Sequence, residues 1–104
     1  MSFATEVIVL DNFSEDGSVE LAEGHKAVDR VIALPRRRGK AHNDSELIGA
    51  AHGEYCLLLN EDAFLQPGAT ATLVDALDSN SSAAAAGAKL LQPDGKEQPS
   101  AWRF

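Results

Sequence analysis

The sequence has few of the residues on which several classes of protein depend. It contains one cysteine, Cys56, so an intrachain disulfide is impossible and a cysteine-built zinc site is disfavoured. Nine basic residues face 16 acidic ones, and the net charge of −7 argues against general nucleic-acid binding. No apolar run reaches the length of a membrane span, and the first residues do not resemble a secretory signal. We therefore expect a cytoplasmic protein without a membrane span.

The short motifs of common catalytic and phosphate-binding sites are also missing. Gly17 and Gly39 are isolated, so there is no glycine-rich phosphate loop, and no serine lies in a nucleophile-elbow pattern. The three histidines, His25, His42 and His52, are scattered without a repeated metal-binding spacing. We interpret each of them as a surface residue.

The most informative stretch is GEYCLLLNED, which begins at Gly53. Its apolar and aromatic run, Tyr55 to Leu59, predicts a strand buried on both faces in a parallel sheet, with Cys56 as a small core residue. The stretch ends with three oxygen-bearing side chains, Asn60 to Asp62, at the carboxyl end of that strand, where open α/β sheets bind ligands. Two carboxylates there suit a hard divalent cation that holds a diphosphate. A solvated turn before the next helix is the alternative interpretation.

The rest of the chain alternates between predicted strands and helices. A β-branched run that ends at Asp11 predicts the first strand, and Pro35 stops the second. Asn43 and Glu46 have capping-box spacing at the start of the second helix, and QPDG is a turn signal after the last strand. The expected strands are residues 6–11, 28–34, 55–59 and 85–91, and the expected helices are residues 19–27, 43–52 and 68–77.

This order of elements predicts the α/β fold class. Short connections indicate a mostly parallel sheet of about four strands in a three-layer α/β/α arrangement, with right-handed crossovers. At 104 residues the chain is expected to form a single domain, residues 1–104. Its tail, residues 91–104, carries Trp102 and Phe104, two apolar residues that need a partner surface. The tail is therefore a possible interface or a lid on the core, and a platform for binding a sugar is the alternative.

Four segments of the chain resemble one known family. VIVLDNFSEDGS begins at Val7, AAHGEYCLLLNED at Ala50, a Pro-Gly pair with its following helix at Pro67, and KLLQPDG at Lys89. In this order and spacing they are similar to family 2 glycosyltransferases, the inverting GT-A type that includes rhamnosyltransferase-like members. The resemblance covers about residues 6–95 and implies a partial GT-A, Rossmann-like fold.

The resemblance implies a site for a nucleotide-diphosphate sugar. In such enzymes the acidic residue that ends the strand matching residues 7–11, here Asp11, contacts the nucleoside, and Asn12 follows it. Basic residues before the middle helix would add phosphate contacts, which places Arg38 and Lys40 in the nucleotide-binding set. A solvated loop is the alternative for this basic cluster.

The same resemblance implies a divalent metal, Mg²⁺ or Mn²⁺. Residues Asn60, Glu61 and Asp62 match the D-x-D-like element of the family, with Asp62 at its last position. Glu61 and Asp62 would bind the metal, and Asn60 would lie beside the diphosphate. The metal would offset the charge that builds on the leaving diphosphate as the sugar transfers.

The chain also departs from the family pattern. Family members carry a strand and a helix before the segment that starts here, and an acceptor half with the catalytic base after the part matched here. We therefore expect only the N-terminal nucleotide-sugar-binding half, which would not transfer a sugar alone, and no catalytic residue is assigned. The missing strand would lie between those of residues 7–11 and 55–60 and would leave backbone groups unpaired. We therefore expect that a second copy of the chain, in a homodimer, or a partner chain fills the gap and completes the sheet. The alternative is that the two flanking strands close up.

Two other interpretations use the same residues. A non-catalytic, self-associating or partner-binding α/β module would account for the missing strand and the aromatic tail. A phospho-acceptor, receiver-like domain would use Asp11, Asp62 and Lys89 at successive strand ends, but it leaves the four family segments unexplained. Mutation of Asp62 separates the leading hypothesis from the first alternative, because it would weaken nucleotide binding and leave self-association unchanged.

Overall fold

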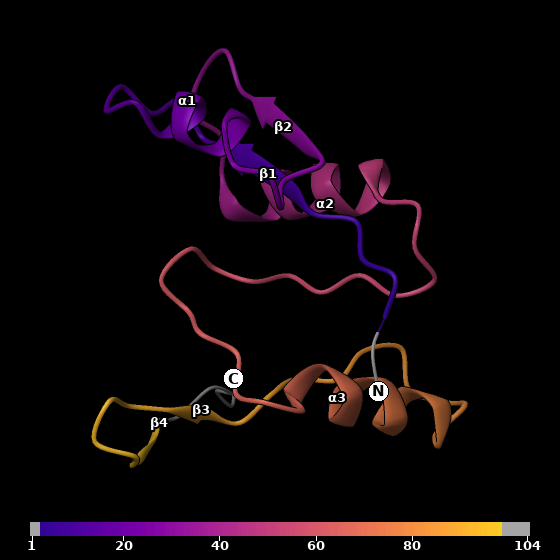
Figure 1. The fold of residues 1–104 in the computed structure, drawn as a ribbon. Coiled ribbons are helices and arrows are strands. Elements are labelled where there is room, and N and C mark those ends of the chain that lie inside the picture. The colour runs from indigo at the N-terminus through magenta and orange to yellow at the C-terminus, as the bar shows by residue number, and fades with distance from the viewer. Residues whose placement is uncertain (1–2, 99–104) are drawn as a thin grey trace. The chain divides into compact units, whose positions relative to one another are not determined.

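A computed structural model describes residues 3–98 of the chain (Figure 1). The chain divides into two compact units, Met1–Asn60 and Glu61–Phe104, and each is described by itself. The expectation of a single domain over residues 1–104 stays a prediction. Trp102 and Phe104, on which the predicted tail interface depends, lie outside the described residues.

The first unit is built on two parallel strands. Their register places Ile8 opposite Arg30 and Asp11 opposite Ala33, so both strands end at the same edge. A parallel pair needs a crossover connection, and α1 lies in that connection. The prediction of an α/β fold with parallel strands is confirmed for this pair. Its elements are β1 (Ile8–Asp11), α1 (Ser18–Glu23), β2 (Arg30–Ala33) and α2 (Lys40–Ala50).

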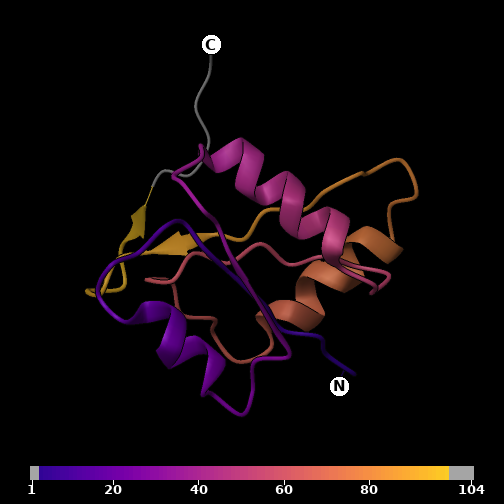
Figure 2. The same cartoon turned by 90° about the horizontal axis from the view of Figure 1, so that it is seen from above.

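A helix lies on each side of this strand pair. Helix α1 contacts both strands and α2 contacts β1, and Figures 1 and 2 show the two helices on opposite sides of the pair. The most buried described side chains are Leu34, which follows β2, and Asp11, which ends β1. The buried centre of the unit therefore lies at the carboxyl edge of the strands and includes a carboxylate.

Glycine residues precede both helices of this unit. Gly17 has a φ of 87°, a left-handed conformation that glycine adopts without a Cβ clash, and it is the N-cap of α1. Gly39 is the N-cap of α2, so the helix begins at Lys40. The predicted capping role of Asn43 and Glu46 is wrong, because the backbone turns into the helix one turn earlier and the N–H of Asn43 already bonds to the Gly39 carbonyl at 3.1 Å.

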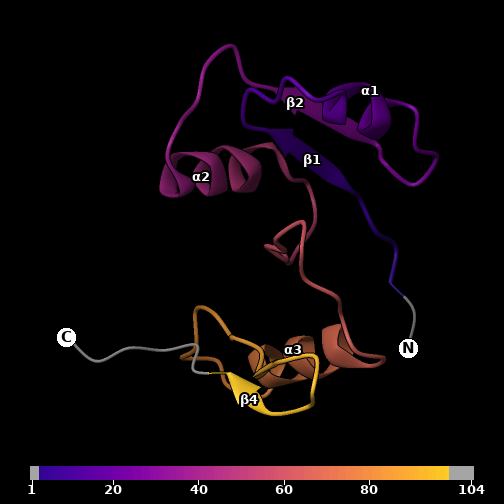
Figure 3. The same ribbon diagram turned by 90° about the vertical axis from the view of Figure 1, so that its left-hand side faces the viewer.

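The second unit contains a helix and a short hairpin, α3 (Ala69–Asp78), β3 (Leu90–Leu91) and β4 (Glu97–Gln98); Figure 1 labels all three, and Figure 3 shows α3 and β4 from the side. The hairpin turn closes through bonds from the Gly95 N–H to the Gln92 carbonyl and from the Gln92 N–H to the Lys96 carbonyl, each 2.8 Å. Gly95 takes a φ of 87°, the left-handed position of a three-residue hairpin loop. The turn predicted from QPDG is confirmed.

The predicted sheet of about four strands differs from what the described residues form. They contain one parallel pair, β1–β2, and one antiparallel pair, β3–β4. Only Leu90 and Leu91 of the expected strand 85–91 are in a strand, and their partner is antiparallel because the tight turn at Gly95 folds the chain back on itself. The expectation of a fourth parallel strand is therefore corrected.

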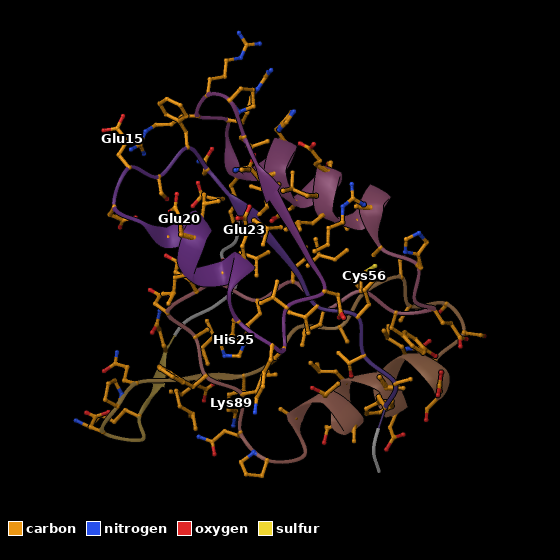
Figure 4. All side chains as sticks on the ribbon, turned by 45° about the horizontal axis from the view of Figure 1, so that its top comes forward. Glu15, Glu20, Glu23, His25, Cys56 and Lys89 are labelled. Carbon is orange, nitrogen blue, oxygen red and sulfur yellow. The ribbon has the colours of Figure 1, made fainter. Side chains whose placement is uncertain are left out.

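The expected central strand over Tyr55–Leu59 is not formed in the structure. The segment has no regular secondary structure, and Leu57, Leu58 and Leu59 are 44–51% exposed. Cys56, labelled in Figure 4, is exposed rather than a core residue. The apolar run encodes a tendency to be buried, but a strand also needs a neighbour for its N–H and C=O groups, and within residues 3–98 neither β1 nor β2 pairs with this segment.

Candidate functional site

The carboxyl ends of β1 and β2 bring three of the predicted site residues together. Asp11 is the last residue of β1, Asn12 follows it, and Arg38 lies in the loop between β2 and α2. The N–H of Leu34 donates to the Asp11 carbonyl at 3.0 Å, which extends the strand pairing by one residue. The pairing therefore brings the loop after β2 next to the end of β1.

The Asp11 side chain is buried, at 8% exposure, but only partly engaged. Its Oδ2 accepts the backbone N–H of Ser14 at 2.8 Å, which closes the turn after β1. Oδ1 accepts no hydrogen bond from residues 3–98, and no side-chain oxygen or nitrogen in that range is buried without a partner. The second carboxylate oxygen thus keeps contact with solvent and remains available to a ligand.

Asn12 is bonded to the backbone of Arg38 through both polar atoms of its amide. The Arg38 N–H donates to Asn12 Oδ1 at 2.8 Å, and Asn12 Nδ2 donates to the Arg38 carbonyl at 3.0 Å. This reciprocal pair joins residues 26 apart in the sequence. It fixes the backbone of the basic loop against the end of β1.

The three arginines of this loop, Arg36, Arg37 and Arg38, are exposed, and their guanidinium groups form no ion pair with any described residue. Lys40 differs, because its Nζ lies 2.8 Å and 3.1 Å from the two carboxylate oxygens of Asp44, one turn on in α2. Unpaired arginines are notable in a chain with a net charge of −7. Arginine donates several N–H groups in a planar fork that matches phosphate oxygens.

The remaining predicted site residues lie at the division between the units. Asn60 ends the first unit, and Glu61 and Asp62 begin the second. All three side chains are exposed, and none makes a hydrogen bond or ion pair with another residue in the described part of the chain. No group of three or more His, Cys, Asp or Glu side chains that could hold a metal is present between residues 3 and 98. The assignment of Mg²⁺ or Mn²⁺ to Glu61 and Asp62 stays a prediction.

Two shallow hollows lie outside the predicted site. One, of about 190 Å³, lies at the amino end of β2 and is lined by Glu23 and residues 28–31. The other, of about 360 Å³ and mainly apolar, lies in the second unit between α3 and residues 86–89. Glu23 projects from α1 beside Glu20, and Glu15 lies on the loop after β1 (Figure 4). Neither hollow includes a predicted nucleotide-binding or metal-binding residue.

Phe13 is a feature of the site that the sequence did not indicate. Its φ is 63°, so a bulky residue takes the left-handed conformation at the end of β1, and its side chain is 41% exposed. For an L-residue this conformation costs about 1–2 kcal/mol. Two hydrogen bonds, from the Ser14 N–H to Asp11 Oδ2 and from the Arg38 N–H to Asn12 Oδ1, hold the chain in this strained turn. A glycine or asparagine at position 13 would have signalled the turn, whereas phenylalanine gives no such signal.

The comparisons with known proteins bear on these arrangements. The sequence model of Glycosyl transferase family 2 matches residues 3–101. The chain belongs to glycosyltransferase family 2. Membership implies an α/β fold of the GT-A type, of which β1, α1, β2 and α2 form the described parallel part. No curated protein and no solved structure matches the chain significantly. Within residues 3–98, no helix of this family 2 chain is long and apolar enough to cross a membrane.

Proposed function

We propose that this family 2 chain binds the nucleotide-diphosphate part of a sugar donor at the carboxyl ends of β1 and β2. The observation that carries the proposal is the pair of hydrogen bonds between Asn12 and the Arg38 backbone. These bonds hold a loop of arginines, whose guanidinium groups have no ion-pair partner among the described residues, beside the buried carboxylate of Asp11. A carboxylate that accepts hydrogen bonds and a group of cations that attracts phosphate are the two kinds of contact that a nucleoside diphosphate needs. Family membership makes such a donor the natural ligand.

The roles follow from the chemistry of each side chain. Asp11 Oδ1 accepts a hydrogen bond from the nucleoside, since Oδ2 is already bonded to Ser14. Arg38, with its neighbours in the loop, donates to the diphosphate oxygens. Lys40 also contributes positive charge, but its ion pair with Asp44 reduces its attraction for phosphate. The four segments that resemble family 2, taken together, are the basis for proposing a rhamnosyltransferase-like member.

A divalent cation, Mg²⁺ or Mn²⁺, is the second part of this proposal. Glu61 and Asp62 are adjacent, exposed carboxylates without a cation partner among the described residues, and Asn60 adds an amide oxygen. Oxygen ligands of this kind suit Mg²⁺, which is held by one or two carboxylates together with substrate phosphates. The cation would supply charge neutralisation for the leaving diphosphate when bound.

A backbone-amide NMR titration tests donor binding directly. UDP, dTDP and GDP are each added with and without Mg²⁺ to the wild-type chain and to Arg38→Ala and Arg30→Ala. Arg30 is an exposed arginine at the amino end of β2, so Arg30→Ala removes the same charge at the opposite end of the strand. We expect shifts at Asp11, Asn12 and the loop, weakened by Arg38→Ala and retained in Arg30→Ala. Absence of shifts at millimolar nucleotide would overturn the proposal.

A second candidate function, a self-associating or partner-binding module, is favoured by a different observation. Leu57, Leu58 and Leu59 expose 47%, 44% and 51% of their surface, and the strand pair is open at its edges within the described residues. Exposed apolar runs and open strand edges are common features of protein interfaces. A second copy or a partner chain that adds a strand would cover both.

Sedimentation analysis of two variants separates the candidates. If the apolar run mediates association, Leu58→Asp lowers the oligomeric mass and Asp62→Asn leaves it unchanged. If the family site binds nucleotide, Asp62→Asn weakens Mg²⁺-dependent nucleotide binding and Leu58→Asp does not. A wild-type chain that stays monomeric at all concentrations would reject self-association.

A further inference from the structure

The loop between β2 and α2 depends on one side chain for its conformation. Between Pro35 and Arg38 the loop backbone makes no hydrogen bond to another part of the described chain except the two between Arg38 and the Asn12 side chain. Separate backbone bonds hold the two positions that flank this segment. The Leu34 N–H donates to the Asp11 carbonyl, and the Gly39 carbonyl accepts a bond from the first turn of α2. Asn12 is therefore the contact that holds the loop between these two anchors.

The amide of Asn12 is suited to holding the loop and is poorly placed to bind a nucleotide as well. Its oxygen accepts from the Arg38 N–H and its nitrogen donates to the Arg38 carbonyl, so both polar atoms bind the same residue. This reciprocal pairing fixes position and orientation of the Arg38 backbone together. A ligand that competed for the amide would have to release the loop that carries the arginines.

The side chains of the loop have no comparable restraint. Arg36, Arg37 and Arg38 have exposed guanidinium groups without an ion-pair partner in residues 3–98. A flexible arginine loses conformational entropy when it binds phosphate, and a fixed backbone reduces that loss. The strained φ of Phe13, next to Asn12, indicates that this turn is held in place rather than relaxed.

We propose that Asn12 is a positioning residue for the arginine loop and not a direct nucleotide ligand. The inference rests on the proposed function, since it concerns how the chain presents Arg38 to a diphosphate. It assigns Asn12 a role different from that expected from the sequence, where Asn12 was placed with the nucleotide-contacting residues. The loop is presented through the backbone of Arg38, and the guanidinium makes the contact.

A double-mutant cycle on nucleotide binding distinguishes positioning from contact. Affinity is measured with Mg²⁺ and whichever of UDP, dTDP and GDP binds the wild-type chain most tightly. The variants are Asn12→Ala, Arg38→Ala and the combination of the two, with Arg30→Ala as the charge control. We expect each single change to weaken binding roughly tenfold, as loss of a charge-assisted contact does, and the double change to weaken it roughly tenfold as well. Arg30→Ala remains within about twofold of the wild type.

Amide hydrogen exchange supplies a readout that a general loss of stability would not reproduce. The Arg38 N–H donates to Asn12 and the Leu34 N–H donates to the Asp11 carbonyl. In Asn12→Ala we expect faster exchange at Arg38 and unchanged exchange at Leu34. Faster exchange at both positions would mean that the variant unfolds this edge, and Asn12 would then be a structural residue rather than a positioning one.

The outcomes separate this inference from the proposed function. If the wild-type chain binds nucleotide and the two single losses multiply to roughly a hundredfold loss of affinity in the double variant, the positioning role is overturned and the proposed donor binding still stands. Wild-type affinity in Asn12→Ala would overturn it as well. Failure of the wild-type chain to bind any of the three nucleotides would overturn the proposed function, and this inference with it.

Discussion

Glu6 and His52 are joined by two contacts that connect the chain before β1 to the chain after α2. Glu6 Oε1 accepts the backbone N–H of His52 at 3.0 Å, and Oε2 lies 2.9 Å from the imidazole Nδ1. Both residues are exposed and lie in the first unit, 46 positions apart. The side-chain hydrogen bond with His52, followed by the backbone bond, holds the pKa of Glu6 below its ordinary value.

The first prediction concerns the pH dependence of this contact. Because the pKa of Glu6 is lower in the folded chain, its stabilising effect is complete above the unfolded pKa and is lost as the pH falls through the folded pKa. Glu6→Gln should therefore lower the Tm at pH 7, and this loss should shrink as the pH falls below the ordinary pKa of glutamate. Thermal unfolding followed by circular dichroism at several pH values measures this difference.

A matched control for this prediction is Glu15→Gln. Glu15 is exposed on the loop after β1 and forms no hydrogen bond or ion pair within residues 3–98 (Figure 4). We expect its substitution to leave the Tm unchanged across the same pH range. A Tm loss in Glu6→Gln that does not shrink as the pH falls would mean that the ionised carboxylate is not responsible.

Local sequence patterns predicted the two strands of the first unit that the structure contains. The β-branched run before Asp11 predicted a strand over residues 6–11, and β1 occupies Ile8–Asp11. The second strand was expected over residues 28–34 and is found at Arg30–Ala33. These elements are determined by the propensities and turn residues of neighbouring positions, which a sequence displays directly.

Features that depend on distant parts of the chain could not be predicted. The run Tyr55–Leu59 predicts burial, but whether it forms a strand depends on a neighbour that no local pattern specifies. The hydrogen bonds between the Asn12 side chain and the Arg38 backbone join positions 26 apart. Because the partner is the backbone, the residue type at position 38 gives no sign of this contact. The sequence therefore indicated candidate residues for the site but not the hydrogen bonds that Asn12 makes with the Arg38 backbone.

The second prediction separates the structural and binding roles of Asp11. Asp11→Ala removes the acceptor of the Ser14 N–H and should lower the free energy of unfolding by about 1–3 kcal/mol. Asp11→Asn keeps an oxygen acceptor, so its cost in stability should be smaller. Chemical denaturation measures both. If Asp11 accepts a hydrogen bond from the nucleoside, nucleotide binding should weaken in both variants, and wild-type affinity in Asp11→Asn would reject that role.

The third prediction concerns the strained backbone at Phe13. Asparagine tolerates a positive φ, whereas a β-branched residue does not. Phe13→Asn and Phe13→Val both remove the aromatic ring, so their difference reports the backbone conformation. We expect Phe13→Asn to be more stable than Phe13→Val by about 1 kcal/mol in chemical denaturation. Equal stability, or greater stability of the valine variant, would show that position 13 does not hold the left-handed conformation in solution.

The last prediction tests the metal assigned to the carboxylates at the start of the second unit. If Glu61 and Asp62 bind a divalent cation that contacts the diphosphate, removal of Mg²⁺ with EDTA should weaken nucleotide binding by roughly tenfold or more. Asp62→Asn should weaken binding in Mg²⁺ to a similar extent and should make it insensitive to EDTA. Asp75→Asn, an exposed carboxylate on α3, is the matched control and should behave as the wild type. Isothermal titration with each variant, in Mg²⁺ and in EDTA, measures these effects. Nucleotide binding that is equally tight in EDTA and in Mg²⁺ would mean that the arginine loop binds the diphosphate without a metal.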